Sequence, residues 1–263
     1  MAEYVGTENQ VSLQKRLQEK QSWFKETPGA FNGGRILGFD DPDQIGWSRV
    51  VELAIADKLA LFPLFHKDEI FEKITKHLGA NWKTPYWLAY LGRPKDVIDV
   101  SRSRVEEIAL PTGWTIDVTE MPSDDQIEAI QALNSETGVS PYPAYFSRGE
   151  AAPIVTICFA DAEGQLKAAA SGVMRYHPRS RLGGYLFAGM VSVKGDSRGI
   201  GMGKLANAVL MVESHARLSW KIVQEQAAPD NPASIAMIQS CGLKFDEDLI
   251  SVVTIDSDET FTR

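Results

Sequence analysis

Apolar residues in the first part of the chain recur mainly at intervals of three and four, the spacing of amphipathic helices. This pattern predicts a helix over residues 11–24, a second one from Trp47 that Pro63 ends, and a third over residues 70–78. An apolar run at residues 86–91 predicts a single strand. We therefore expect residues 1–110 to form a mainly helical N-terminal region.

The pattern changes after the turn-forming residues 111–113, where strands and helices begin to alternate. Ser123 and Gln126 have the spacing of a capping box, which predicts a helix start. The expected strands cover residues 114–118, 154–159, 166–176, 185–193, 221–226 and 249–255. This alternation predicts an α/β domain over residues 111–263.

The most informative stretch joins the strand at 185–193 to a long amphipathic helix through the segment RGIGMGK, residues 198–204. Its glycines bring backbone with little side-chain bulk to the start of the helix. Free N–H groups and the positive end of the helix dipole favour an anion there, above all a phosphate. The segment therefore predicts a site for a phosphorylated ligand.

Three glycine motifs compete for this segment, and two of them fit it poorly. A Walker A loop fails at both ends, because Arg198 stands at its first position and Leu205 at its last. Gly201 and Gly203 fit a dinucleotide fingerprint, with Glu225 at a suitable distance, but too little chain follows to build the remaining βα units. A glycine turn of purely structural use is the remaining alternative to a ligand site.

Two stretches that follow one another in the chain favour the third motif. Arg198, Gly201 and Gly203 follow a strand in the pattern Arg/Gln-x-x-Gly-x-Gly/Ala, and residues 231–243 begin a helix with Asn and end in Gly-Leu. Both stretches resemble the acetyl-CoA-binding motifs of the GNAT superfamily of N-acetyltransferases, and the order of elements agrees over residues 112–255. The resemblance implies a GNAT fold, with a mixed central sheet flanked by helices and an extra, mainly helical region before it.

The resemblance also implies acetyl-CoA as co-substrate and assigns residues to it. The strand would pair with the pantetheine arm, the glycine segment would hold the pyrophosphate, and the Asn-led helix would reach the arm from the other side. The cofactor-binding residues expected in this way are Met190, Val191, Val193, Arg198, Gly199, Ile200, Gly201, Met202, Gly203, Lys204, Asn231 and Ser234. An N–H of the Met190–Val191 region is the natural donor to the thioester oxygen.

The catalytic groups are less sharply indicated. An ammonium acceptor needs a base in the acceptor cleft, and Glu136, Glu150 and His177 flank the segments that line this cleft in the family. A Tyr of the Asn-led helix often protonates the leaving thiolate, but here that position is Ile238. Tyr142 and Tyr145, in the aromatic stretch 140–146, are the fallbacks. We take Glu136, Tyr142 and His177 as the catalytic candidates.

Charge and composition narrow the partners. A net charge of −8 argues against nucleic acid or an anionic membrane as the main partner, and no apolar run is long enough to span a bilayer. The chain has only two cysteines, Cys158 and Cys241, and both lie in apolar elements, which suits buried thiols in a reducing compartment. No signal peptide is visible, so we expect a cytoplasmic protein. His66 and His77 have no companion at metal-ligand spacing, so no metal is expected.

The sequence thus favours an N-acetyltransferase that moves an acetyl group to a primary amine of a small molecule, by direct attack in a ternary complex. The acidic balance favours a cationic acceptor. The alternatives are a protein or peptide acceptor and a non-catalytic acyl-CoA-binding module. We expect the N-terminal region to pack beside the acceptor cleft and help define the substrate, the alternative being a self-contained appendage or a homodimerisation surface.

Overall fold

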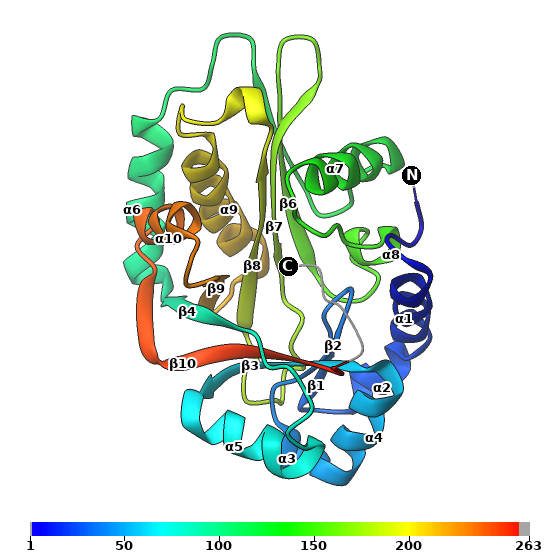
Figure 1. The fold of residues 1–263 in the computed structure, drawn as a ribbon. Helices are drawn as coiled ribbons and strands as arrows, with labels where there is room; N and C mark the ends of the chain where they lie inside the picture. The colour runs from blue at the N-terminus through cyan, green and yellow to red at the C-terminus, as the bar shows by residue number, and fades with distance from the viewer. Residues whose placement is uncertain (1, 258–263) are drawn as a thin grey trace.

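The computed structural model describes residues 2–257, whose strands form one continuous twisted sheet (Figure 1). In chain order the strands are β1 Ala30–Asn32, β2 Leu37–Phe39, β3 Leu59–His66, β4 Tyr86–Gly92, β5 Thr115–Thr119, β6 Ile154–Ala160, β7 Leu166–Val173, β8 Tyr185–Val193, β9 Ile222–Ala227 and β10 Lys244–Ile255. Their order across the sheet is β1-β2-β3-β10-β4-β9-β8-β7-β6-β5. The fold is α/β with a mixed sheet, as the sequence predicted.

Helices flank this sheet along its whole length. They are α1 Glu8–Glu19, α2 Gln21–Glu26, α3 Pro42–Ile45, α4 Trp47–Asp57, α5 Lys67–Leu78, α6 Pro94–Glu107, α7 Asp124–Glu136, α8 Ala144–Ser147, α9 Met202–Leu218 and α10 Pro232–Ser240, with a short 3-10 turn at Gly195–Ser197. No helix within residues 2–257 has both the length and the apolar character needed to cross a bilayer.

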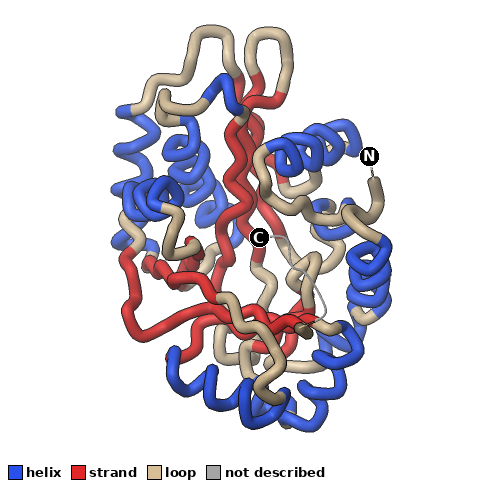
Figure 2. Tube along the Cα trace, in the orientation of Figure 1, coloured by secondary structure: helices blue, strands red, loops and turns tan. Residues whose placement is uncertain are grey.

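Two layers of helices cover opposite faces of the strands β6–β8 (Figures 1 and 2). Helix α9 packs against all three strands and carries α6 and α10 on its outer side, while α7 packs against β7 and β8 from the other face. The alternation of β8 explains this arrangement, because Leu186 and Ala188 join the core under α9 whereas Phe187 packs with Tyr142 and Phe146. The helices α3–α5 lie around the opposite end of the sheet, against β2, β3 and β10.

The N-terminal region contributes strands to the interior of the sheet. Strand β4 lies between β9 and β10 and is antiparallel to both, and β3 pairs with the other edge of β10. Helix α6, which the sequence pattern left without a prediction, packs on α9. The sheet therefore runs without interruption across the expected boundary at residues 110–111.

Pro63 marks the clearest difference from the sequence prediction. Helix α4 ends at Asp57, and Pro63 lies inside β3, where we expected only the end of a helix. The register between β3 and β10 shifts at this point, between Ile250 and Val252, and Leu64 has a positive φ of 55°. Proline is tolerated at such a bulge because its missing N–H would have no partner in the ladder.

Smaller differences concern boundaries. The helix expected at 11–24 is divided into α1 and α2 at Lys20, and the aromatic stretch 140–146 runs into the one-turn helix α8. The capping box forms as predicted: Gln126 N donates to Ser123 Oγ at 3.3 Å, and Ser123 N donates to Gln126 Oε1 at 2.8 Å.

Candidate functional site

The parallel strands β8 and β9 separate part-way along their length. They pair at Tyr185–Ile222, Leu186–Val223 and Phe187–Gln224, and no described residue of β9 pairs with β8 beyond that point. Strand β9 goes on to Ala227, but it does so paired to β4 alone. The edge of β8 over residues 188–193 is therefore open toward β9, and its N–H and C=O groups on that side can pair with an extended ligand.

A bulge interrupts β8 directly at this opening. Its pairing with β7 jumps from Ser171–Gly189 to Ala169–Ser192, so that β8 carries an extra residue. Met190 adopts a φ of 53°, an uncommon conformation for a residue with a side chain. Bulges and such strained residues gather at functional sites, where they redirect backbone groups. The Met190–Val191 backbone, expected to face the thioester, lies within this feature.

The glycine segment leads from the open strand into α9. Gly199 and Gly201 have φ values of 80° and 90°, and Gly201 is the N-cap of the helix, where a side chain would be strained. Arg198 is tied to the end of β8, since its Nε donates to the carbonyl oxygen of Val193 at 3.1 Å. Arg198, Gly199, Ile200 and Lys204 are all exposed, which leaves the helix N-terminus accessible to an anion.

The two residues expected from α10 sit at its first turn. Asn231 is the N-cap, and its Oδ1 accepts from the N–H of Ser234 at 3.0 Å. This cap uses only the amide oxygen, and the NH₂ group of Asn231 remains an available donor. Ile238, at the position of the expected tyrosine, is 1% exposed in the core under α9.

The three catalytic candidates have different local environments. Glu136 is exposed on the last turn of α7. His177 is held in the loop after β7, where Nε2 lies 3.2 Å from the carbonyl oxygen of Lys25 and Nδ1 accepts from Arg179 N. Tyr142 is buried, and this burial raises the pKa of its phenol. No hydrogen bond joins any two of the three, and their roles stay predictions.

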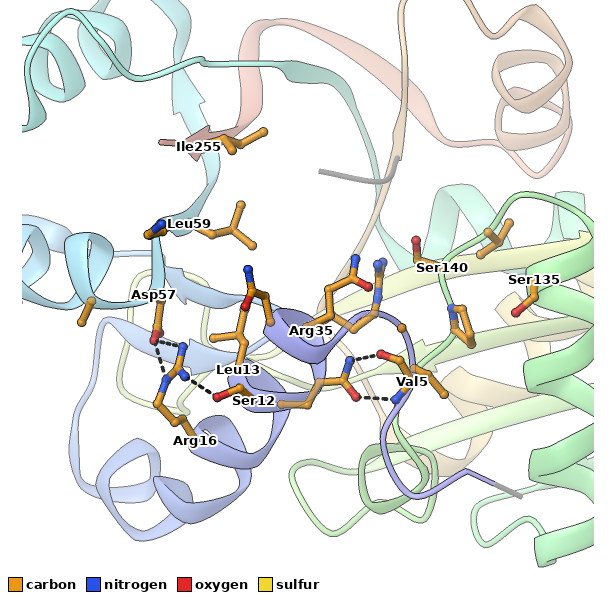
Figure 3. A pocket seen from close by; sticks show the side chains of 18 of the residues that line it. Val5, Ser12, Leu13, Arg16, Arg35, Asp57, Leu59, Ser135, Ser140 and Ile255 are labelled. Atoms are coloured by element: carbon orange, nitrogen blue, oxygen red, sulfur yellow. Dashed lines mark hydrogen bonds and ion pairs between the residues drawn. The ribbon is translucent and has the colours of Figure 1, made fainter. Parts of the chain in front are cut away.

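A partly open cavity of about 510 Å³ lies beside the aromatic stretch (Figure 3). One wall comes from α1 and the start of β3, and the opposite wall from residues 138–141 after α7. Arg35, in the loop between β1 and β2, lines it between Leu13 and Ser140 (Figure 3). Arg16 and Asp57 form an ion pair at its wall, with 2.9 Å between Nη2 and Oδ1. The N-terminal region thus lines a cavity together with the α7–α8 loop.

Two arginines near Tyr142 escaped the sequence analysis. Arg35 and Arg175, the second residue after β7, both act electrostatically on the Tyr142 phenol. Arg175 is 8% exposed, and its guanidinium carbon lies 3.7 Å from the ring centre of Phe187. The only signal in the sequence was a charged residue inside the apolar run at 166–176. Nothing in the sequence marked Arg35, because a Gly-Gly-Arg segment is typical of any turn.

A buried acid on β9 also went unrecognised as a titrating group. Glu225 is 2% exposed and faces α9, where Asn207 Nδ2 donates to its Oε1 at 2.8 Å. Burial raises the pKa of Glu225 to about 7. Cys241 lies in the same cluster, and burial raises the pKa of its thiol to about 12, which argues against a nucleophilic cysteine. Both Cys158 and Cys241 are free and buried.

Solved structures establish the fold. A GCN5-related N-acetyltransferase from Kribbella flavida superposes with a TM-score of 0.56 over 84% of this chain and 78% of its own, at 16% identity. A tandem GNAT protein from the clavulanic acid biosynthesis pathway gives 0.58 over 93% and 89%, at 15% identity. A Drosophila protein gives 0.60 over 95% and 90%, at 12% identity.

No protein-family model matches the sequence. The search of curated proteins finds no significant match either. At these identities the structural likeness concerns the fold, and it covers the N-terminal region as well as residues 112–255. The chain has a GNAT fold, as the two sequence motifs predicted.

Proposed function

We propose that the protein is an acetyl-CoA-dependent N-acetyltransferase acting on a primary amine of a small molecule. The observation that carries the proposal is the parting of β8 from β9 after Phe187 and Gln224, followed at once by the bulge at Met190 and the glycine segment. An open strand edge, a redirected backbone and a helix N-terminus then follow one another along a single stretch of chain.

The residues of this stretch fit the three parts of acetyl-CoA. The N–H groups from Gly199 to Gly203 and the start of α9 suit the pyrophosphate, and the open edge of β8 suits the amides of the pantetheine arm. An added Cβ at Gly203 would occupy space beside this backbone, 3.6 Å from Met237 Sδ and 3.7 Å from Val193 Cγ2. The co-substrate would supply an acetyl group as a thioester that an amine attacks directly.

The protein's own groups have two tasks in this reaction. A backbone N–H at Met190 or Val191 would donate to the thioester oxygen as negative charge develops on it. The acceptor amine must be uncharged to attack, and Glu136 or His177 would remove its proton, directly or through water. Tyr142 would be the fallback proton donor to the leaving thiolate. With Ile238 buried, the thiolate would leave without a tyrosine of α10.

The cavity between α1 and the α7–α8 loop favours a small acceptor. Its volume of about 510 Å³ is of the size that holds a small molecule, and the N-terminal region encloses it on one side. A protein or peptide acceptor would need an open groove instead. The third alternative, an acyl-CoA-binding module without catalysis, shares the binding residues and differs only in turnover.

Two measurements test the proposal. Calorimetry should show that acetyl-CoA and CoA bind far more tightly than NAD or ATP, and thiol release should rise when a panel of small amines is added. Binding without amine-dependent thiol release would favour the non-catalytic module. Absence of CoA binding would contradict the proposal altogether.

A further inference from the structure

Arg175, which is buried, and Arg35, which is half-buried, form an unusual pair of cations beside Tyr142. Arg175 has one side-chain hydrogen bond, from Nη2 to the Tyr176 hydroxyl at 3.1 Å, and its Nε is buried without a partner. The Nε of Arg35 is also buried without a partner. Neither guanidinium has a carboxylate within ion-pair distance among residues 2–257.

Two buried carboxylates, Asp57 and Asp40, lie in this part of the fold, but neither forms an ion pair with Arg35 or Arg175, and one oxygen of each is buried without a hydrogen bond. Asp57, in the wall of the cavity, is paired with Arg16. Asp40, near Tyr176, accepts from Leu182 N at 3.1 Å and acts electrostatically on Arg181. The remaining neighbours of Arg175 are rings, with its guanidinium carbon 4.8 Å from the centre of Phe31 and 3.7 Å from that of Phe187. Within residues 2–257, neither guanidinium therefore has an anionic partner.

Such an arrangement is costly unless an anion completes it. An arginine stays protonated in proteins, so burial cannot remove its charge, and an unpaired buried charge is strongly destabilising. A carboxylate or phosphate accepts two parallel N–H bonds from a guanidinium and would satisfy the orphaned donors. The rings of Phe187 and Phe31 lie close to the Arg175 guanidinium and restrict its position.

Arg35 lines the cavity, and Arg175 lies against Phe187 of β8. Arg35 reaches into the cavity from the β1–β2 loop (Figure 3). Both guanidinium groups act electrostatically on the Tyr142 phenol. Arg175 stacks on Phe187, the last residue of β8 that pairs with β9. The glycine segment is at the far end of β8, well away from the β1–β2 loop in Figure 1, so the phosphates expected at α9 would not fill this position.

We infer that the amine acceptor carries an anionic group, a carboxylate or a phosphate-like group, and that Arg35 and Arg175 bind it. This inference rests on the proposed function, and it replaces the cationic acceptor that the overall charge favoured. The acidic surface sets the long-range field, whereas these two side chains set the charge of the acceptor site itself. Binding the anion at Phe187 would leave the amine of the same molecule facing the opening of β8.

The first experiment compares matched acceptors. The rate constant kcat/KM is measured for two sets of anionic amines, the twenty amino acids and ω-amino acids with one to three methylene groups. Each is compared with its carboxamide, with an alkylamine of equal length and with the corresponding aminoalkylphosphonate. In the wild type the anionic amines should exceed the carboxamides by about 100-fold or more, because the site would otherwise keep unpaired buried donors. The ratio between carboxylates and phosphonates distinguishes the two anions.

Variants connect this preference to the two arginines. Arg35→Gln and Arg175→Gln should bring the ratio within about threefold of unity, and Arg35→Lys should retain part of it, because a lysine keeps the charge but not the fork. Arg49→Gln is the matched control, since Arg49 lies exposed on α4 in an ion pair with Glu52. It should keep the full preference. Equal rates for carboxylates and carboxamides in the wild type would overturn the inference.

A binding measurement separates this inference from the proposed function. N-acetylated amino acids and their carboxamides are titrated in a thermal-shift assay without CoA, on the wild type and on Arg35→Gln. Carboxylate binding that Arg35→Gln abolishes, in a protein that fails to bind acetyl-CoA, would support the anion site and contradict the acetyltransferase. If acetyl-CoA binds but no carboxylate binds the wild type more tightly than it binds Arg35→Gln, the result would support the acetyltransferase and contradict the anion site.

Discussion

The side chain of Asn32 donates a hydrogen bond to the hydroxyl of Tyr145 at 3.1 Å, inside the protein and across 113 residues of sequence. Asn32 ends β1, and Tyr145 lies in α8, so the bond joins the N-terminal region to the aromatic stretch beside the cavity. Burial raises the pKa of Tyr145 to about 12, which keeps its phenol protonated at physiological pH. The contact is therefore neutral and insensitive to pH.

Removing the two partners should have unequal effects. Tyr145→Phe loses one neutral hydrogen bond and should lower the free energy of unfolding by about 1 kcal/mol. Asn32→Ala also loses the bond from Gly34 N to Asn32 Oδ1, at 2.7 Å, and should cost about 3 kcal/mol. Chemical denaturation of both single variants and the double variant checks this. The double variant should resemble Asn32→Ala alone, and additive effects would show that the pair is not coupled.

Glycine substitutions test the expected pyrophosphate site. Gly203→Val should weaken acetyl-CoA binding about tenfold or more, because the side chain blocks backbone approach to an anion. Gly201→Val should do the same and also lower stability, since Gly201 has a φ of 90° and its added Cβ would lie 3.3 Å from Ile108. Gly195→Ala is the control, because an added Cβ there meets nothing within 4 Å. Calorimetry on the three variants measures the affinities, and unchanged binding by both valine variants would remove the site.

Glu225 makes stability depend on pH. Because its pKa rises from 4.5 to about 7 on folding, the folded state binds more protons than the unfolded state between these values. The free energy of unfolding should therefore fall as pH rises through this window, by about 3 kcal/mol in all, and stay level above it. Glu225→Gln keeps the shape and should abolish this slope. Urea denaturation at pH 4.5 and pH 8 measures it, and an equal slope in both proteins would contradict the assignment.

Separating the chain at residues 110–111 should prevent folding of either piece. A chain starting at Pro111 lacks β4, so β9 and β10 lose the strand between them, and it lacks α6, which covers α9. Expressed alone, residues 111–263 should be insoluble, whereas co-expression with residues 1–110 should yield a soluble complex. Circular dichroism and gel filtration would check this outcome. A soluble, folded 111–263 fragment would contradict it.

Local patterns predicted much of this molecule. The strand β8, the glycine segment and α9 follow one another directly, and so the GNAT fold and the expected CoA-binding residues could be inferred from adjacent positions. The place of β4 could not, since pairing between Leu88 and Ala227 depends on residues far apart in sequence. Likewise, only the folded structure shows that no carboxylate among residues 2–257 pairs with Arg35 or Arg175. Pro63 misled the prediction because its bulge lies in a strand that forms against β10.

The position of β10 has a consequence for how the chain acquires its structure. Leu64 N donates to Ser251 Oγ across 187 residues, so one edge of β3 finds its partner only in β10, which is made long after it. As the chain leaves the ribosome, β3 and β4 thus expose unpaired edges until β9 and β10 arrive. Pairing over such separations closes large loops and is slow, and open strand edges favour association with other chains. We expect refolding from denaturant to be slow and its yield to fall as protein concentration rises.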